Sequence, residues 1–167
     1  MRLPALIACS AVICALALPA LRPPRADSST TSLDDRAERK VIRLVNHIRA
    51  RRGLRRLTVS RALAAAATVH SGDMLRRNYI GHASSDGTPM STRVHRYTRA
   101  RWLGENLAIF SGPGSTPQRV VQMWMRSPGH RRMLLSRRSR RIGVGKRTGR
   151  VGQMLGAVYT ADFASLR

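Results

Sequence analysis

The stretch Trp124-Met125-Arg126-Ser127-Pro128-Gly129-His130-Arg131 does most to identify the fold of this chain. Ser127 is a favourable helix N-cap, and Pro128 suits the first helical position because its missing N–H needs no partner there. His130 then lies in the first turn of a short helix, where the positive end of the helix dipole disfavours the imidazolium form. A neutral imidazole can bind a metal ion or accept a proton. His130 is therefore a candidate site residue whose partners come from elsewhere in the chain.

The segments on either side of this stretch predict a helix and a hairpin. Thr116 is expected to cap the preceding helix, which buries Val120, Val121 and Trp124. Residues 141–146 predict a strand, Thr148-Gly149 a turn, and residues 154–163 the antiparallel partner. Glycines at 143, 145, 152 and 156 indicate bulges or close packing of the backbone under helices.

Two longer helices are expected earlier in the chain. The first is capped by Ser32, with Asp34 and Asp35 in its first turn, and ends at Gly53. Asn46 and Arg49 lie on or beside its buried stripe, where they serve either as polar edge residues or as structural hydrogen-bonding groups.

The second helix is expected to run from a cap at Ser60 to about Arg77, after an extended link in which Leu57 and Val59 face inward. His70 lies on its apolar face, which is more typical of a core histidine than of a ligand.

Two further polar residues stand in unusual places. His82 follows Gly81 on a loop, and loops carry a large share of functional residues. Glu105 lies between a glycine and an apolar run, so it is either part of a site or a buried acceptor that needs a partner. Between them, residues 91–101 predict a short basic helix or turn with an exposed His95.

The N-terminal residues 1–21 begin with a short positively charged segment, Met1-Arg2, and continue as an apolar stretch from Leu3 to Leu21. This pattern is typical of a secretory signal peptide. An uncleaved membrane anchor is the alternative. Residues 22–32 predict a polar linker, which leaves 33–167 as one domain. Both cysteines, Cys9 and Cys14, lie in the first segment, so the mature chain is expected to have neither a disulfide nor a thiolate metal site. We expect a secreted protein, either extracellular or in the cell envelope.

The chain is strongly basic. Its formal net charge is +23 at pH 7, and only Lys40 and Lys146 among its 31 basic residues are lysines. Such a surface attracts anionic envelope polymers, lipid headgroups or nucleic acid, unless the arginines only reflect the codon bias of a GC-rich genome. Few aromatic residues accompany them for base stacking, so no specific nucleic-acid partner is predicted. The best candidate for an anion-binding patch is Arg131 to Arg141.

Three residues stand in unusual sequence positions and have side chains that can bind a metal ion or transfer a proton. They are His82, Glu105 and His130. No two of them share a predicted helix, so only the fold can bring them together. Two imidazoles and a carboxylate form a reasonable ligand set for zinc or a similar divalent ion, with open positions for water.

Seven motifs in order resemble a known family. They are Asn46-x-x-Arg49, the alanine-rich helix 63–74, Tyr79-Ile80-Gly81-His82 with Asp86-Gly87, Gly104-Glu105-Asn106-Leu107-Ala108, Trp124 to Arg131, Ile142-Gly143-Val144-Gly145, and Tyr159-Thr160 to Phe163. Over residues 41–163 the chain resembles the CAP superfamily of cysteine-rich secretory proteins, antigen five and plant pathogenesis-related proteins. It is most similar to the short bacterial secreted members.

The resemblance implies an α+β fold, a three-layer α-β-α sandwich with a central antiparallel sheet. It also implies a cleft lined by two histidines and two acids, in which His82 and His130 are the histidines and Glu105 is the first acid. The second acid would fall near Ser127, where this chain has no carboxylate. Structural positions of the family would be Asn46, Arg49, Asn106 and Trp124.

A non-catalytic module that binds a small ligand, lipid or peptide, with or without a divalent ion such as zinc, is the favoured function. The missing acid favours it, as does the lack of a cysteine or Gly-x-Ser-x-Gly nucleophile in the mature chain. The first alternative is a metal-dependent secreted hydrolase of the peptidase type, in which His82 and His130 hold zinc and Glu105 ligates it or activates water. The second is adhesion to anionic envelope polymers through the arginines.

Overall fold

The computed structural model describes residues 28–165, with side chains from residue 35 onward. The predicted signal peptide 1–21 therefore lies outside the described residues. In chain order the elements are α1 Ser28–Ala50, β1 Thr58–Val59, α2 Arg61–Arg77, α3 Met90–His95, β2 Leu103–Ser111, α4 Pro117–Arg126, α5 Pro128–Leu135, β3 Arg141–Val151 and β4 Met154–Ala164.

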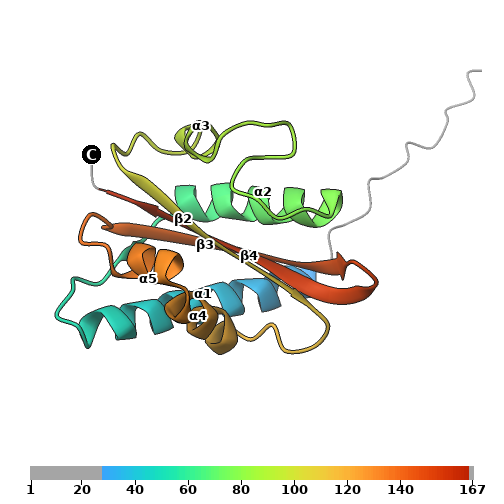
Figure 1. Cartoon of the computed structure of the whole chain (residues 1–167), viewed down its shortest axis with the longest axis horizontal. Coiled ribbons are helices and arrows are strands. Elements are labelled where there is room, and N and C mark those ends of the chain that lie inside the picture. Colours follow the sequence, from blue (N-terminus) through green and yellow to red (C-terminus); the bar gives the residue numbers. More distant parts are fainter. Residues whose placement is uncertain (1–27, 166–167) are drawn as a thin grey trace, which may run out of the picture.

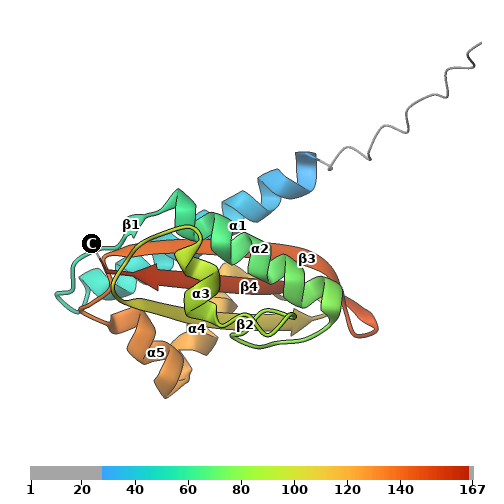
Figure 2. The ribbon, with the colours of Figure 1, turned by 90° about the horizontal axis from the view of Figure 1, so that it is seen from above.

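The four strands form one sheet in the order β1-β3-β4-β2. Strand β4 pairs antiparallel with both β2 and β3, while the two residues of β1 pair parallel with β3. Helices α1, α4 and α5 cover one face of the sheet, and α2 and α3 cover the other (Figures 1 and 2). The predicted α-β-α sandwich is thus confirmed, and β2 lies at an edge of the sheet.

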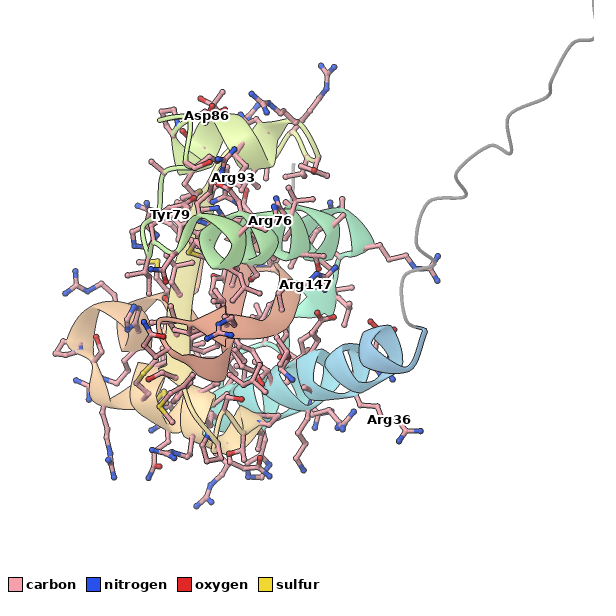
Figure 3. All side chains as sticks on the ribbon, turned by 90° about the vertical axis from the view of Figure 1, so that its right-hand side faces the viewer. Arg36, Arg76, Tyr79, Asp86, Arg93 and Arg147 are labelled. Atoms are coloured by element: carbon pink, nitrogen blue, oxygen red, sulfur yellow. The ribbon has the colours of Figure 1, made fainter. Side chains whose placement is uncertain are left out.

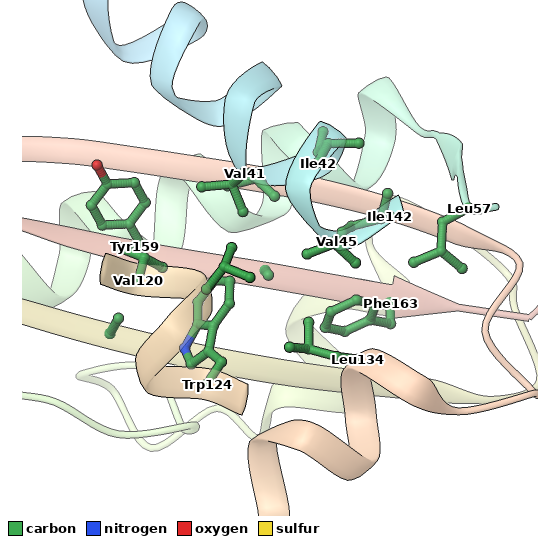
Figure 4. Packing of buried hydrophobic residues seen from close by; sticks show 14 of the residues in the cluster. Val41, Ile42, Val45, Leu57, Val120, Trp124, Leu134, Ile142, Tyr159 and Phe163 are labelled. Carbon is green, nitrogen blue, oxygen red and sulfur yellow. The ribbon is translucent and has the colours of Figure 1, made fainter. Parts of the chain in front are cut away.

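The largest apolar cluster lies between the sheet and helices α1, α4 and α5 (Figure 4). Alternate residues of β4 point into it, as expected for a strand with a different environment on each face. These residues are Ala157, Tyr159, Ala161 and Phe163. Trp124 of α4 is fully buried there, and its indole N–H donates to the carbonyl of Leu107 at 2.8 Å. The core therefore joins α4 directly to the edge strand.

On the other face, α2 lies almost directly on the backbone of β3. A Cβ atom on Gly143 would lie 2.1 Å from the backbone nitrogen of Ala64, and one on Gly145 would lie 2.2 Å from that of Thr68. No side chain fits at these distances, so the two glycines set the separation between helix and strand. This confirms the predicted packing under a helix for Gly143 and Gly145, whereas Gly152 lies in the hairpin turn and Gly156 meets the backbone of Phe110 on β2.

Two structural polar residues tie α1 to the loops that follow it. Asn46 exchanges hydrogen bonds with the backbone of Leu57, at 3.0 Å through its amide nitrogen and 2.7 Å through its amide oxygen. Arg49 is buried and donates to the carbonyls of Arg55, Leu134 and Ser136 at 2.7–3.0 Å. Both residues thus hold backbone groups that no helix or strand satisfies.

Several local predictions were wrong. Helix α1 begins at Ser28 rather than after a cap at Ser32, so the end of the predicted linker is helical. The first turn of α1 therefore contains no acid. Val59 is 59% exposed, because β1 is only two residues long and lies at a sheet edge. The hairpin turns at residues 152–153 rather than at Thr148-Gly149.

The cap predictions at Ser60 and Thr116 are confirmed, since both side chains accept a helix N–H. No helix among residues 28–165 has the length and apolar character needed to cross a membrane.

Candidate functional site

The candidate site is built on Glu105, a buried residue of β2. One carboxylate oxygen, Oε1, lies 2.7 Å from Nδ1 of His82. The other, Oε2, accepts a hydrogen bond of 2.6 Å from Nη2 of Arg93 on α3. Arg93 is also buried, so Glu105 and Arg93 form an ion pair shielded from water. A charge in such a place requires a close partner of opposite sign.

A second buried carboxyl, Asp162 of β4, lies directly opposite Glu105 in the strand register. Its Oδ2 is 3.9 Å from Nη1 of Arg93, and neither of its carboxyl oxygens has a hydrogen-bond partner among residues 28–165. Burial, together with the nearby charge of Glu105, raises the pKa of Asp162 well above its ordinary value. Two acids thus share one guanidinium, and Asp162 is the one that favours its neutral form.

Glu105 keeps its negative charge. Burial acts to raise its pKa, but the hydrogen bond from His82 and the positive charge of Arg93 outweigh it, and the pKa of Glu105 is lowered. The side chain of His82, by contrast, is 61% exposed. Its hydrogen bond to Glu105 raises the pKa of His82. Because the carboxylate can only accept, Nδ1 of His82 carries a proton, and the ring faces solvent as a polarised imidazole or imidazolium.

The loop that carries His82 is held in place by Asp73 of α2. The carboxylate of Asp73 accepts from the hydroxyl of Tyr79 at 2.7 Å, and from the backbone N–H and hydroxyl of Ser85 at 2.8 Å each. These bonds join the two ends of residues 79–85 to the helix. A hydrogen-bonded loop of this kind positions His82 without burying it.

His130 approaches the edge strand from the opposite side. It lies in the first turn of α5, and its backbone carbonyl accepts a hydrogen bond of 3.0 Å from the side chain of Asn106. Asn106 follows Glu105 on β2, so the two side chains point to opposite faces of the sheet. The backbone of His130 is therefore held against β2 by a residue next to Glu105.

The imidazole of His130 favours its neutral form. Burial, followed by the charge of His82, lowers the pKa of His130. Its Nδ1 is buried and has no hydrogen-bond partner in the described part of the chain. Ser127 occupies the N-cap position of α5, but its side chain makes no capping hydrogen bond, so the predicted cap is wrong in that respect. Ser127 is instead the single residue between the two helices, the C-cap of α4 and the N-cap of α5.

The arrangement does not by itself form a metal site. Both oxygens of Glu105 and one nitrogen of His82 are already engaged with each other or with Arg93. Among residues 28–165, no group of three or more His, Cys, Asp or Glu side chains is arranged to hold an ion. Of the expected trio, His82 and Glu105 are joined by a hydrogen bond, and the imidazole of His130 lies close enough to His82 to be affected by its charge.

His70 is fully buried beneath the site. Its Nε2 lies 2.9 Å from the carbonyl oxygen of Gly81 and 4.0 Å from Oε2 of Glu105. Burial and the charge of Arg93 lower the pKa of His70, which therefore remains neutral. Through its contact with Gly81, His70 supports the loop before His82. Because it is fully buried, neither ring nitrogen is accessible from solvent for binding a metal ion.

A hollow of about 860 Å³ lies beside His82. This volume is in the range of small-molecule sites. It is lined by Arg77, Tyr79, Gly81 and the loop 82–87. The exposed ring of His82 thus borders a space large enough for a ligand.

Sequence reasoning missed Arg93 and Asp162. Arg93 was one of many arginines, and nothing in its own segment distinguishes it from the exposed ones. Asp162 was recognisable, because it is an acid in the apolar run 154–163. The argument that identified Glu105 applies equally to Asp162.

Comparison with known proteins gives consistent matches. The model of the cysteine-rich secretory protein family, CAP, matches residues 42–163. YkwD of Bacillus subtilis (strain 168) is 37% identical over 109 residues, which cover 65% of this chain and 41% of YkwD. YlbC, named as a membrane protein of the same bacterium, is 30% identical over 122 residues, covering 71% of this chain and 34% of YlbC. The chain spans less than half the length of these curated relatives.

Solved structures share the fold. An extracellular protein with an SCP domain from Bacillus anthracis str. Ames superposes with a TM-score of 0.72 at 27% identity, covering 87% of this chain and 45% of that one. An outer surface protein of Borrelia burgdorferi gives a TM-score of 0.67 at 20% identity, covering 79% and 94%. The family match extends over most of the chain and includes every element around Glu105, and so the chain belongs to the cysteine-rich secretory protein (CAP) family.

Proposed function

We propose that this CAP domain acts outside the cytoplasm as a non-catalytic binding module, with its ligand site beside His82. The apolar stretch of residues 1–21 supports export. The match to an extracellular protein of Bacillus anthracis supports it independently. The hollow beside His82 would accept a small molecule, or the end of a lipid or peptide.

One observation carries the proposal: each carboxylate oxygen of Glu105 is engaged by a partner, Oε1 by His82 and Oε2 by Arg93. A carboxylate that accepts from both partners at 2.6–2.7 Å is held as a fixed anion, and its side chain is only 1% exposed, so it offers solvent almost no surface for activating water. Its effect is to orient the ring of His82 and to favour its protonated form. The geometry therefore serves recognition better than acid–base turnover.

The same geometry favours one ligand chemistry. With Nδ1 bonded to Glu105, the protonated ring of His82 offers Nε2–H to the hollow, and Arg77 lines the hollow as well. Both groups donate hydrogen bonds and carry positive charge. A carboxylate group on the ligand, such as the C-terminus of a short peptide, complements them.

NMR titration with two matched probes tests this proposal. N-acetyl-Ala-Ala with a free carboxylate is expected to shift the imidazole resonances of His82, whereas its C-terminal amide leaves them unchanged. The acid is also expected to shift the backbone amide resonances of residues 83–87, which line the hollow. That shift should disappear in His82→Ala and persist in His95→Ala, a control for an exposed histidine. Equal shifts from acid and amide, or a full response in His82→Ala, would contradict carboxylate recognition.

The resonances of the free protein give a separate pH prediction. The pKa of His82 is expected above the ordinary value of 6.5, and that of His130 below it. The stabilisation from protonated His82 should be complete at acidic pH and lost as the pH rises through the raised pKa. Crossed values, with His130 titrating above His82, would refute the assigned hydrogen bond.

Zinc binding by His82 and His130, with or without hydrolysis, is the alternative proposal. The neutral ring of His130, whose Nδ1 has no hydrogen-bond partner among residues 28–165, supports it, while the engagement of Glu105 with Arg93 weighs against it. Melting temperatures measured with and without added zinc distinguish the two. A rise that His130→Ala abolishes would support the alternative, and an unchanged melting temperature would support the metal-free module.

A further inference from the structure

Two consecutive apolar residues, one on each face of the strand, lie exposed near the tip of the β3–β4 hairpin. Leu155 is 72% exposed and Met154 is 52% exposed. The hairpin extends past the ends of the helices (Figures 1 and 2). Along β4, Leu155 continues the row of Tyr159 in the main core, and Met154 continues the row of Val158 under α2. On both faces of β4, the apolar side chains thus continue beyond the helices that cover the rest of the strand.

A second loop completes the tip. The backbone N–H of Gly112 donates to the carbonyl of Leu155 at 2.6 Å, and the hydroxyl of Tyr159 donates to the carbonyl of Ser115 at 2.7 Å. These bonds hold residues 112–115 against the hairpin. Between the loops lies a hollow of about 480 Å³, lined by Gly112, Pro113, Ser115, Thr148, Met154, Leu155 and Gly156. The apolar tip therefore consists of the hairpin and a second loop that is hydrogen-bonded to it.

Arginines surround this tip. Arg150 pairs with Leu155 in the strand register, and Arg119 packs over the ring of Phe110 at 6.0 Å. Arg76 of α2 and Arg147 of β3 both lie close to Gly72. Figure 3, which views the molecule from this end, labels both arginines. The sequence contains no carboxylate between Glu105 and Asp162. On α2, the acid next to this end is Asp73, whose carboxylate is bonded to Tyr79 and Ser85.

We propose that the hairpin tip docks the protein onto the surface of an anionic phospholipid bilayer. Leu155 and Met154 would enter the boundary between headgroups and acyl chains, and the surrounding arginines would contact lipid phosphates. Apolar side chains framed by basic residues are suited to this interface, because apolar burial and attraction to anionic lipids reinforce each other. The aliphatic stems of arginine can also pack against the apolar layer while the guanidinium stays in water.

The charge of the tip favours a bilayer over a second copy of the chain. A symmetric dimer through this tip would bring two sets of arginines together, and their mutual repulsion opposes association. An anionic bilayer, by contrast, supplies the negative charge that these arginines attract.

Depth-dependent fluorescence quenching tests the orientation directly. Tryptophan is introduced in Leu155→Trp at the tip and in Val59→Trp at the other end of the sheet, as a control that is 59% exposed. With vesicles of brominated phosphatidylcholine and phosphatidylglycerol, additional quenching is expected for Leu155→Trp only. Trp102 and Trp124 contribute equally to both variants, and residues 1–27 are the same in both. Equal quenching of the two variants, or none in either, would overturn the proposal.

Vesicle partitioning tests the two contributions. Met154→Ser/Leu155→Ser is expected to lower the partition coefficient at least tenfold, as the loss of two apolar side chains implies. Arg147→Gln/Arg150→Gln is expected to lower it by about tenfold or more on anionic vesicles only. Val59→Ser should leave it unchanged, and thermal melts verify that all variants fold. Unchanged partitioning in both double variants would contradict the proposal, as would a dimer that Met154→Ser/Leu155→Ser disrupts.

Discussion

Strand β4 presents Tyr159 and Phe163 to α1, α4 and α5, and Thr160 and Asp162 to α2 and α3. Both sets of side chains are fully buried, yet the first set is held by apolar packing and the second by hydrogen bonds and charge. Apolar packing is indifferent to pH, whereas a buried ionisable network is not. The difference means that the α2 face can position charged groups for binding while the other face supplies stability.

The largest expected effect comes from removing the shared cation. Arg93→Ala leaves the buried carboxylate of Glu105 with only the exposed His82 as a partner, beside the buried Asp162, and is expected to cost about 3–5 kcal/mol of unfolding free energy. The loss should be larger at pH 7 than at pH 4, because protonation relieves an unpaired carboxylate. Urea unfolding at both pH values measures this.

Leu134→Ala provides the matched variant on the apolar face. It is expected to lose about 2–5 kcal/mol through the cavity it leaves, by the same amount at both pH values. If the loss in Arg93→Ala were equally independent of pH, the two faces would not differ as described.

The next effect concerns the spacing of the α2 face. Gly143→Ala places a methyl group 2.1 Å from the backbone of Ala64, so α2 must move away from β3. We expect a loss of about 3 kcal/mol, at the upper end for overpacking. Because α2 carries Asp73, which anchors the His82 loop, the NMR resonances of His82 should also shift. A stable variant with unchanged His82 resonances would show that the helix position is not limiting.

A smaller, stabilising effect is expected for Asp162→Asn. The pKa of Asp162 is raised in the fold, so the wild-type protein loses stability as the pH rises from the ordinary value of 3.8 through the raised one. The amide does not titrate, and the variant should gain about 1 kcal/mol or more at alkaline pH. Melting temperatures of both proteins across pH 4 to 9 give the comparison. A difference that is constant across this range would contradict a neutral Asp162.

The smallest effect contrasts a crowded glycine with an uncrowded one. Gly129 lies in the first turn of α5, and nothing lies within 4 Å of a Cβ atom built there. Gly129→Ala is therefore expected to stabilise the protein by about 0.5–1 kcal/mol through helix propensity. Differential scanning calorimetry is sensitive enough to detect this gain. A loss of stability would mean that His130 requires flexibility at its neighbour.

Much of the fold was predictable because its signals are local. Caps at Ser60 and Thr116 and the apolar spacing of the helices follow from neighbouring residues alone. The hairpin turn was misplaced because Gly149 is not a turn glycine. A Cβ at Gly149 would meet the side chain of Leu75 at 2.8 Å, so its small size serves packing against α2. Only the tertiary structure distinguishes these two uses of glycine.

The site was predictable in part, for a related reason. His82 and Glu105 stand out because their sequence contexts are unusual, and the structure places them 2.7 Å apart. The distance between His130 and that pair depends on which face of β2 each element approaches, which no motif specifies. Arg93 is chemically identical to the surface arginines around it, and only burial reveals its role.

The glycine contacts under α2 have a consequence for how this sequence can vary among relatives. Positions 143 and 145 admit no Cβ because fixed backbone atoms lie in the way, whereas position 149 meets only the movable end of a leucine side chain. Substitution at 149 can be accommodated by a single change in the facing residue. Substitution at 143 or 145 would require the helix and strand to separate along their shared length. Family members that keep this architecture are therefore expected to retain both glycines even where the charged residues of the site have been exchanged.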